Sequence, residues 1–152
     1  MENKIKWFLI FIPLLTYSEP VKIDLSVIDK EFRSRIENVA GIKIDNAAEF
    51  FENLVTIVER NDSTRFSELV NYPITIILSG KKIKLKTSKQ FLFRYSKIVN
   101  DNVKNAVQNQ KFESLFVNSK GAMFGNGQIW FASVCEDSNC KESKVKIIAI
   151  NQ

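Results

Sequence analysis

The spacing of apolar residues changes near Phe112, and this change indicates the fold class. Before that point apolar residues recur mostly at three- and four-residue intervals, the period of an amphipathic helix. After it they gather in short runs separated by glycine-rich turns, which is typical of strands. The chain has 152 residues, enough for one domain, and its 12 Phe residues supply the bulk for a core. The sequence therefore predicts a small α+β domain.

Three helices are predicted ahead of the first strands. The first spans residues 26–40, ends at Gly41, and has an apolar side made of Ile28, Phe32, Ile36 and Val39. The second begins at a capping box formed by Asn46 and Glu49. Its apolar stripe consists of Phe50, Phe51, Leu54, Ile57 and Val58. A shorter helix with Phe66, Leu69 and Val70 turned inward stops before Pro73, because the residue before a proline avoids helical geometry.

The middle of the chain predicts a β-hairpin and another helix. Residues 74–78 and 81–86 are β-rich and flank a Ser79-Gly80 turn. Thr87 with Gln90 is a second capping-box pattern, opening a helix that buries Phe91, Tyr95 and Ile98. Residues 103–107 add helical turns. Strands are then expected at 115–117, 121–124, 128–134 and 145–150.

The first eighteen residues match an export signal. Lys4 and Lys6 precede the apolar stretch 7–15, which is too short to span a membrane, and Pro13 would break a helix near its end. Thr16 and Ser18 are small residues ahead of a cut after Ser18. We expect residues 1–18 to be a cleaved signal peptide and the protein to be periplasmic or extracellular; an uncleaved anchor and a buried first helix are the alternatives.

The two cysteines agree with export. Cys135 and Cys140 flank a short polar turn, which favours a structural disulfide in an oxidising compartment. The chain has no His. This excludes catalysis by a histidine-containing triad and a histidine-ligated zinc site. We expect no cofactor and no metal.

The order of the predicted elements resembles the NTF2-like (cystatin-like) cone fold. More narrowly, the chain resembles a segment of exported bacterial proteins of unknown function in the stretches LFVNSKGAMFGNGQIWF at 115–131 and IAIN at 148–151. The resemblance covers residues 46–151. It implies N-terminal helices packed on a curved antiparallel sheet with a pocket at its wide end. Residues 46–152 would form this domain, and residues 19–45 an N-terminal extension containing one helix.

Candidate site residues follow from chemistry. Tyr72, Tyr95 and Asp101 could serve acid–base chemistry in a cone pocket, but they match no catalytic motif, and buried tyrosines commonly serve packing. Trp130 and Phe131 should point to opposite faces of their strand, one into the core and one toward a pocket or partner. Tyr72 and Tyr95 are candidates for the same contact.

A cluster of lysines follows the Ser79-Gly80 turn. Lys81, Lys82, Lys84 and Lys86, with Lys89 nearby, could contact an anionic surface. The alternative is that they protect a sheet edge from aggregation. Export and the lack of interleaved aromatic residues disfavour nucleic acid as the partner.

These observations predict an exported, non-catalytic binding domain for a protein or a small apolar ligand, with an immunity or inhibitor protein as a specific version. A small-molecule enzyme using the cone pocket is the alternative. An envelope-surface protein held by its lysines is the third hypothesis. The mature chain is expected to have no transmembrane helix.

Overall fold

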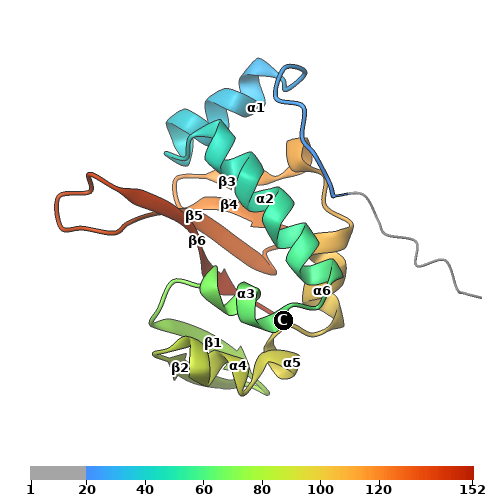
Figure 1. The fold of residues 1–152 in the computed structure, drawn as a ribbon, viewed down its shortest axis with the longest axis vertical. Helices are drawn as coiled ribbons and strands as arrows, with labels where there is room; N and C mark the ends of the chain where they lie inside the picture. The colour runs from blue at the N-terminus through green and yellow to red at the C-terminus, as the bar shows by residue number, and fades with distance from the viewer. Residues whose placement is uncertain (1–19) are drawn as a thin grey trace, which may run out of the picture.

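The computed structural model describes residues 20–152, so the expected signal peptide lies outside the described part. The fold is α+β (Figure 1). The elements before the first strand are α1 (Lys30–Ser34), the π-helix η1 (Arg35–Val39), α2 (Ile44–Glu59) and α3 (Ser63–Glu68). A hairpin of β1 (Ile74–Leu78) and β2 (Lys81–Leu85) follows, then α4 (Ser88–Leu92), α5 (Tyr95–Ile98) and α6 (Asp101–Gln108). The 3-10 turn η2 (Phe112–Ser114) leads into β3 (Phe116–Asn118), β4 (Gly121–Phe124), β5 (Ile129–Cys135) and β6 (Ser143–Ile150).

The first helix is shorter than expected. It begins at Lys30, not near Ser26, because the carboxylate of Asp29 accepts the free N–H groups of Glu31 and Phe32 and caps the helix there. Phe32 and Ile36 are buried as expected, but Val39 is 47% exposed because the π-helical turn rotates it away from the core. Gly41 ends the helix as expected: its φ of +66° lets the N–H of Ile42 reach the carbonyl of Ile36.

The second helix, α2, buries the expected stripe, with Phe50, Phe51, Leu54, Ile57 and Val58 at most 4% exposed. The predicted capping box is wrong. The helix begins at Ile44, two residues earlier, and Asn46 already lies inside it. Ile44 is itself buried, so apolar packing extends the helix past the polar start signal.

The helix predicted after the hairpin is divided in two. Thr87 caps α4 as expected, since its hydroxyl accepts from the N–H of Gln90 at 3.3 Å. The Gln90 side chain, however, accepts from Lys86 and not from Thr87. The chain leaves helical geometry at Arg94, whose φ and ψ are −117° and 7°, and α5 follows. Phe91, Tyr95 and Ile98 are all buried as predicted.

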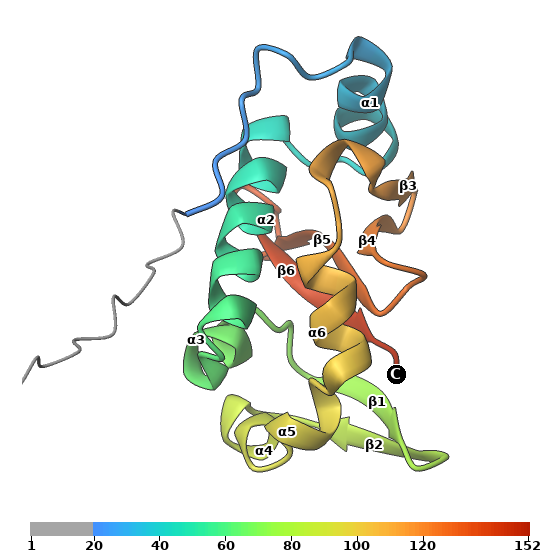
Figure 2. The ribbon, with the colours of Figure 1, turned by 90° about the vertical axis from the view of Figure 1, so that its right-hand side faces the viewer.

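The last four strands form an antiparallel meander in the order β3-β4-β5-β6. Gly121 fits where β4 passes β5, because a β-carbon at this position, with φ of +131°, would collide with the carbonyl oxygen of Phe131. A bulge in β6 interrupts the pairing: Trp130 faces Ala149 while Phe131 faces Ile147, which leaves Ile148 as the extra residue. The sheet is curved and does not close into a barrel (Figures 1 and 2).

The hairpin of β1 and β2 is a separate two-stranded sheet. The two sheets are linked through the segment between α3 and β1. There Val70 forms a parallel bridge with Ile147, the N–H of Ile147 donates to the carbonyl of Leu69 at 2.8 Å, and the N–H of Asn71 donates to the carbonyl of Ile147 at 2.9 Å. This bridge places the hairpin below the four-stranded sheet in Figure 1.

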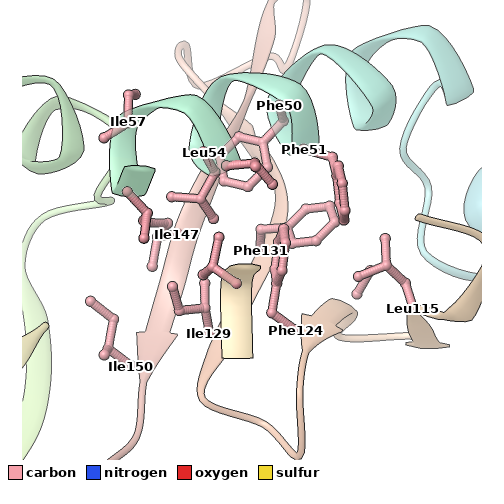
Figure 3. Close-up of a cluster of buried hydrophobic side chains, with 14 of the residues drawn as sticks. Phe50, Phe51, Leu54, Ile57, Leu115, Phe124, Ile129, Phe131, Ile147 and Ile150 are labelled. Atoms are coloured by element: carbon pink, nitrogen blue, oxygen red, sulfur yellow. The ribbon is translucent and has the colours of Figure 1, made fainter. Parts of the chain in front are cut away.

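Aromatic side chains fill the space between α2 and the inner face of the four-stranded sheet (Figure 3). Phe50 stacks on Phe131 with ring centroids 4.8 Å apart, and Phe51 stacks on Phe124 at 5.0 Å. The first helix packs into the same core, since the ring of Phe32 contacts that of Phe112 edge-on at 5.3 Å. Within residues 20–152 no helix is both long and apolar enough to cross a membrane.

Candidate interaction surfaces

Trp130 and Phe131 lie on opposite faces of β5, as the alternation of a strand requires. Phe131 is fully buried against Phe50 on the inner face. Trp130 is partly exposed on the outer face. Figure 2 shows α2 on one side of the four-stranded sheet and no helix over the opposite side. The outer face is therefore open to a partner, and Trp130 is the residue of the pair that such a partner could reach.

A row of apolar side chains crosses the outer face, one from each strand. The register pairs Phe116 with Met123, Met123 with Trp130 and Trp130 with Ala149. Phe116 is 50% exposed, and its ring meets that of Trp130 edge-on at 6.2 Å. The sequence did not single out Phe116 or Met123. The signal that could have found them is their register with Trp130, which depends on both turns between the strands. We call these four residues the outer row.

The indole of Trp130 keeps its polar edge free. Within the described part of the chain its Nε1–H has no hydrogen-bond acceptor, and its one ring contact is with Phe116. Gly127 packs beside it: a β-carbon there would lie 3.4 Å from Trp130 Nε1 and 3.7 Å from Met123 Sδ. A side chain at residue 127 would thus crowd the indole edge. Tryptophan with an accessible donor and an apolar ring is a frequent anchor of protein interfaces.

The two candidate tyrosines lie together in a different place. Tyr72 and Tyr95 each contact the ring of Phe91 edge-on with centroids 6.3 Å apart, and Tyr95 also contacts Phe66. The hydroxyl of Tyr72 donates to the carbonyl of Ser67 at 3.0 Å. The buried hydroxyl of Tyr95 has no hydrogen-bond partner among residues 20–152. The two tyrosines therefore belong to an aromatic cluster between α3 and α4, remote from the outer row in the fold.

Burial raises the pKa of Tyr72 to about 12. Burial also raises the pKa of Tyr95, and the negative charge of Asp62 adds to this effect. A raised phenol pKa keeps the proton on the oxygen at neutral pH, so neither tyrosine is tuned to act as a general base. Asp101 begins α6 as an exposed residue of its first turn.

The cysteine pair forms the expected disulfide at the tip of the hairpin made by β5 and β6, with Cα atoms 4.8 Å apart. Between the cysteines, Asp137 organises the turn by accepting the N–H groups of Asn139, Lys141 and Glu142. The N–H groups of Lys141 and Glu142 lower the pKa of Asp137 most. This hairpin projects from the body of the molecule (Figure 1).

Two open hollows lie between α2 and the first half of β6. The first has a volume of about 390 Å³, and its lining includes Asn46, Glu49 and Asn53 of α2 and residues 143–146 of β6. The second, of about 430 Å³, extends toward the projecting hairpin. Within it Lys144 pairs with Glu136 at 2.8 Å, and this hydrogen bond raises the pKa of Lys144. Both hollows are open to solvent, and the first has polar and apolar residues in its wall, the latter being Phe50, Leu69 and Val145.

The four candidate lysines lie where the sequence predicted. Lys81, Lys82 and Lys84 are exposed on β2, and exposed Lys86 follows the strand. These lysines lie at the end of the molecule that β1, β2, α4 and α5 form, whereas the outer row lies on the four-stranded sheet (Figures 1 and 2). The lysines and the two tyrosines thus share one end of the molecule, the outer row lies on the four-stranded sheet, and the candidate residues do not form one site.

Residues 20–152 contain no group of three or more Cys, Asp or Glu side chains arranged to hold a metal ion. Comparisons of the chain with protein-family models, with curated proteins and with solved structures found no match.

Proposed function

We propose that this protein is an exported, non-catalytic interaction domain with an NTF2-like fold, and that it binds a partner protein through the outer row. The observation that carries the proposal is the uncovered Phe116–Trp130 pair on the outer face. An aromatic pair at the centre of an open sheet face suits a protein interface, where a few aromatic anchors contribute most of the affinity.

The geometry of the core favours binding over catalysis. An enzyme using the cone pocket would need a cavity between α2 and the inner sheet face. In the described structure Phe50, Phe51, Phe124 and Phe131 pack against one another there (Figure 3). A substrate could enter only by displacing these rings, at a cost of several kcal/mol for each buried aromatic side chain lost from the core.

Export is part of the proposal. The disulfide and the lack of a membrane-spanning helix among residues 20–152 fit a chain that matures in an oxidising compartment. An inhibitor or immunity protein that blocks a secreted toxin is the specific version we favour. Such proteins need a rigid binding face and no chemistry of their own.

Native mass spectrometry of the protein isolated from its own host tests the proposal. We expect a complex whose added mass is that of a protein. The double variant Phe116→Ser/Trp130→Ser should lose this partner. A matched control, Val27→Ser/Val39→Ser, removes two apolar residues that are 73% and 47% exposed and do not belong to the outer row, and should retain the partner.

Retention of the partner by the outer-row variant, or loss by both variants, would refute this assignment. The same spectrum gives the mass of the mature chain, which tests cleavage after Ser18. Protection of cells from a toxin encoded nearby, lost with the outer-row variant, would support the immunity version.

A further inference from the structure

One stretch of the chain contains basic residues and no acidic residue. Residues 69–100 include no Asp or Glu. They carry seven positive charges, on Lys81, Lys82, Lys84, Lys86, Lys89, Arg94 and Lys97. This exceeds the net charge of +5 for the whole chain, so the rest of the chain is net negative. The positive charge of the protein is thus concentrated in about a fifth of its length.

The fold gathers these charges at one end. Residues 69–100 form β1, β2, α4 and α5, which lie together at the lower end of the molecule in both ribbon views (Figures 1 and 2). The six lysines are exposed and Arg94 is half-buried. None of the seven forms an ion pair with another described residue. We call this surface the basic end.

Two large apolar side chains are exposed within the basic end. Phe93, directly after α4, is 84% exposed, and Ile77 on β1 is 52% exposed. The hairpin register places Ile77 directly opposite Lys82, and Lys84 lies on the same face of the hairpin. The guanidinium of Arg94 lies 5.3 Å from the ring centroid of Phe93. Each exposed apolar side chain therefore has cationic neighbours.

We infer that the basic end binds the surface of an anionic phospholipid membrane. The lysines would contact lipid phosphates, and Phe93 and Ile77 would enter the boundary between headgroups and acyl chains. Lysine near an anionic leaflet is attracted electrostatically, and its methylene stem tolerates the interfacial region. A soluble anionic polymer would recognise the charges but would leave Phe93 and Ile77 in water, so the apolar pair favours lipid. This inference is independent of the outer row.

Vesicle flotation tests the electrostatic part. The protein is taken as its host exports it, and every variant must show the same N-terminus by mass, so that any contribution of residues before Pro20 cancels. We expect binding to phosphatidylcholine vesicles containing roughly 30 mol % phosphatidylglycerol, little binding to pure phosphatidylcholine, and loss of binding at about 0.5 M NaCl.

Lys82→Gln/Lys84→Gln/Lys86→Gln should weaken partitioning at least about tenfold, since each lysine near the surface contributes. The control Lys111→Gln/Lys120→Gln/Lys141→Gln removes three exposed lysines elsewhere and should lower partitioning less than about threefold. Equal losses for the two triple variants would mean that net charge alone drives binding, and would overturn the inference.

The apolar contacts have their own test. Phe93→Ser and Ile77→Ser should each weaken vesicle binding several-fold, whereas Val39→Ser should not. In Phe93→Trp, brominated lipid should quench the new indole beyond the quenching seen in the parent protein. If the charge variants lose binding but Phe93→Ser and Ile77→Ser bind as before and Phe93→Trp is not quenched, the basic end is a polyanion site and the lipid assignment is wrong. Equal binding to neutral and anionic vesicles would overturn it as well.

Discussion

The four-stranded sheet and the basic end are both packed around aromatic rings, yet their surfaces differ. In the sheet, Phe50 and Phe131 stack behind a face whose outer row is apolar. In the basic end, Phe91 contacts Phe66, Tyr72 and Tyr95 beneath a surface of lysines. Mutual repulsion among these lysines opposes folding slightly. The aromatic interior therefore accounts for the folding of both regions, whereas neither the outer row nor the lysines belong to the core.

The largest expected effect is a difference in the free energy of unfolding between substitutions on the two faces of β5. Phe131→Ala should lower the free energy of unfolding by about 3–5 kcal/mol, because it empties a fully buried site stacked on Phe50. Trp130→Ala on the outer face should cost about 1 kcal/mol. Urea unfolding followed by circular dichroism measures both. Equal losses would show that the outer row is part of the core and would weaken the proposal that it binds a partner.

The disulfide contributes to the sheet and not to the basic end. Cys135→Ser/Cys140→Ser should lower the free energy of unfolding by about 2 kcal/mol, because the bridge closes only a short loop. Hydrogen exchange should rise more in the tips of β5 and β6 than in β1 and β2. An equal or larger rise in β1 and β2 would contradict the separation of the two regions.

The two tyrosines of the basic end should differ in how much their hydroxyl groups contribute to stability. Tyr72→Phe removes a hydrogen bond to Ser67 and should cost about 1 kcal/mol. Tyr95→Phe removes a buried hydroxyl without a described partner, so it should be neutral or stabilise the protein by up to about 1 kcal/mol. Thermal unfolding of both variants gives the difference. The opposite order would show that Tyr95 makes a bond with water or with a residue outside the described part.

The raised pKa of Tyr72 predicts that the protein loses stability at alkaline pH. The pKa of Tyr72 is raised to about 12 in the folded protein, above the value near 10 of an exposed tyrosine. The unfolded chain therefore releases this proton first, so the contribution of Tyr72 to stability is constant below about pH 10 and is lost as pH rises from about 10 to 12. Tyr72→Phe should reduce this fall relative to the parent protein. Absorbance titration of the phenolate checks the pKa directly.

The smallest effect concerns the lysines themselves. Lys82→Glu places an acid among unpaired cations and should raise the free energy of unfolding by a few tenths of a kcal/mol at low salt. High salt should abolish the gain. Lys111→Glu, in the segment between α6 and η2, is the control and should show no gain. A loss of stability with Lys82→Glu would mean that Lys82 is needed for folding.

Helical periodicity was the sequence pattern that predicted the buried residues most reliably. It predicted the buried stripe of α2 correctly because five apolar residues on one face leave few alternatives. The capping-box pattern at Asn46 placed the start of α2 too late, since burial of Ile44 outweighs this polar signal. Periodicity also missed the break at Arg94, which depends on how α4 and α5 pack against α3 and the hairpin and has no local signal.

The surfaces were harder to predict than the core. Alternation along one strand singled out Trp130, but its neighbours Phe116 and Met123 follow only from cross-strand register. The lysines were visible in the sequence, whereas Phe93 looked like any other Phe of a helix and is exposed because the helix ends there. The pairing of β1 with β2 in a hairpin was predicted and is confirmed, whereas element order alone did not predict that this hairpin is a sheet separate from β3–β6.

The bridge between Val70 and Ile147 also constrains the order in which the parts of the chain can fold. A chain delivered from its N-terminus exposes α2, α3 and the β1–β2 hairpin long before β6 arrives. Until then the carbonyl of Leu69 and the N–H of Asn71 lack their backbone partner, and the inner faces of Phe50 and Leu54 lack the strands that cover them. Closing so long a loop is slow compared with local helix formation. The first half of the chain is therefore expected to stay loosely structured until β6 is available, and the compact state forms only after that.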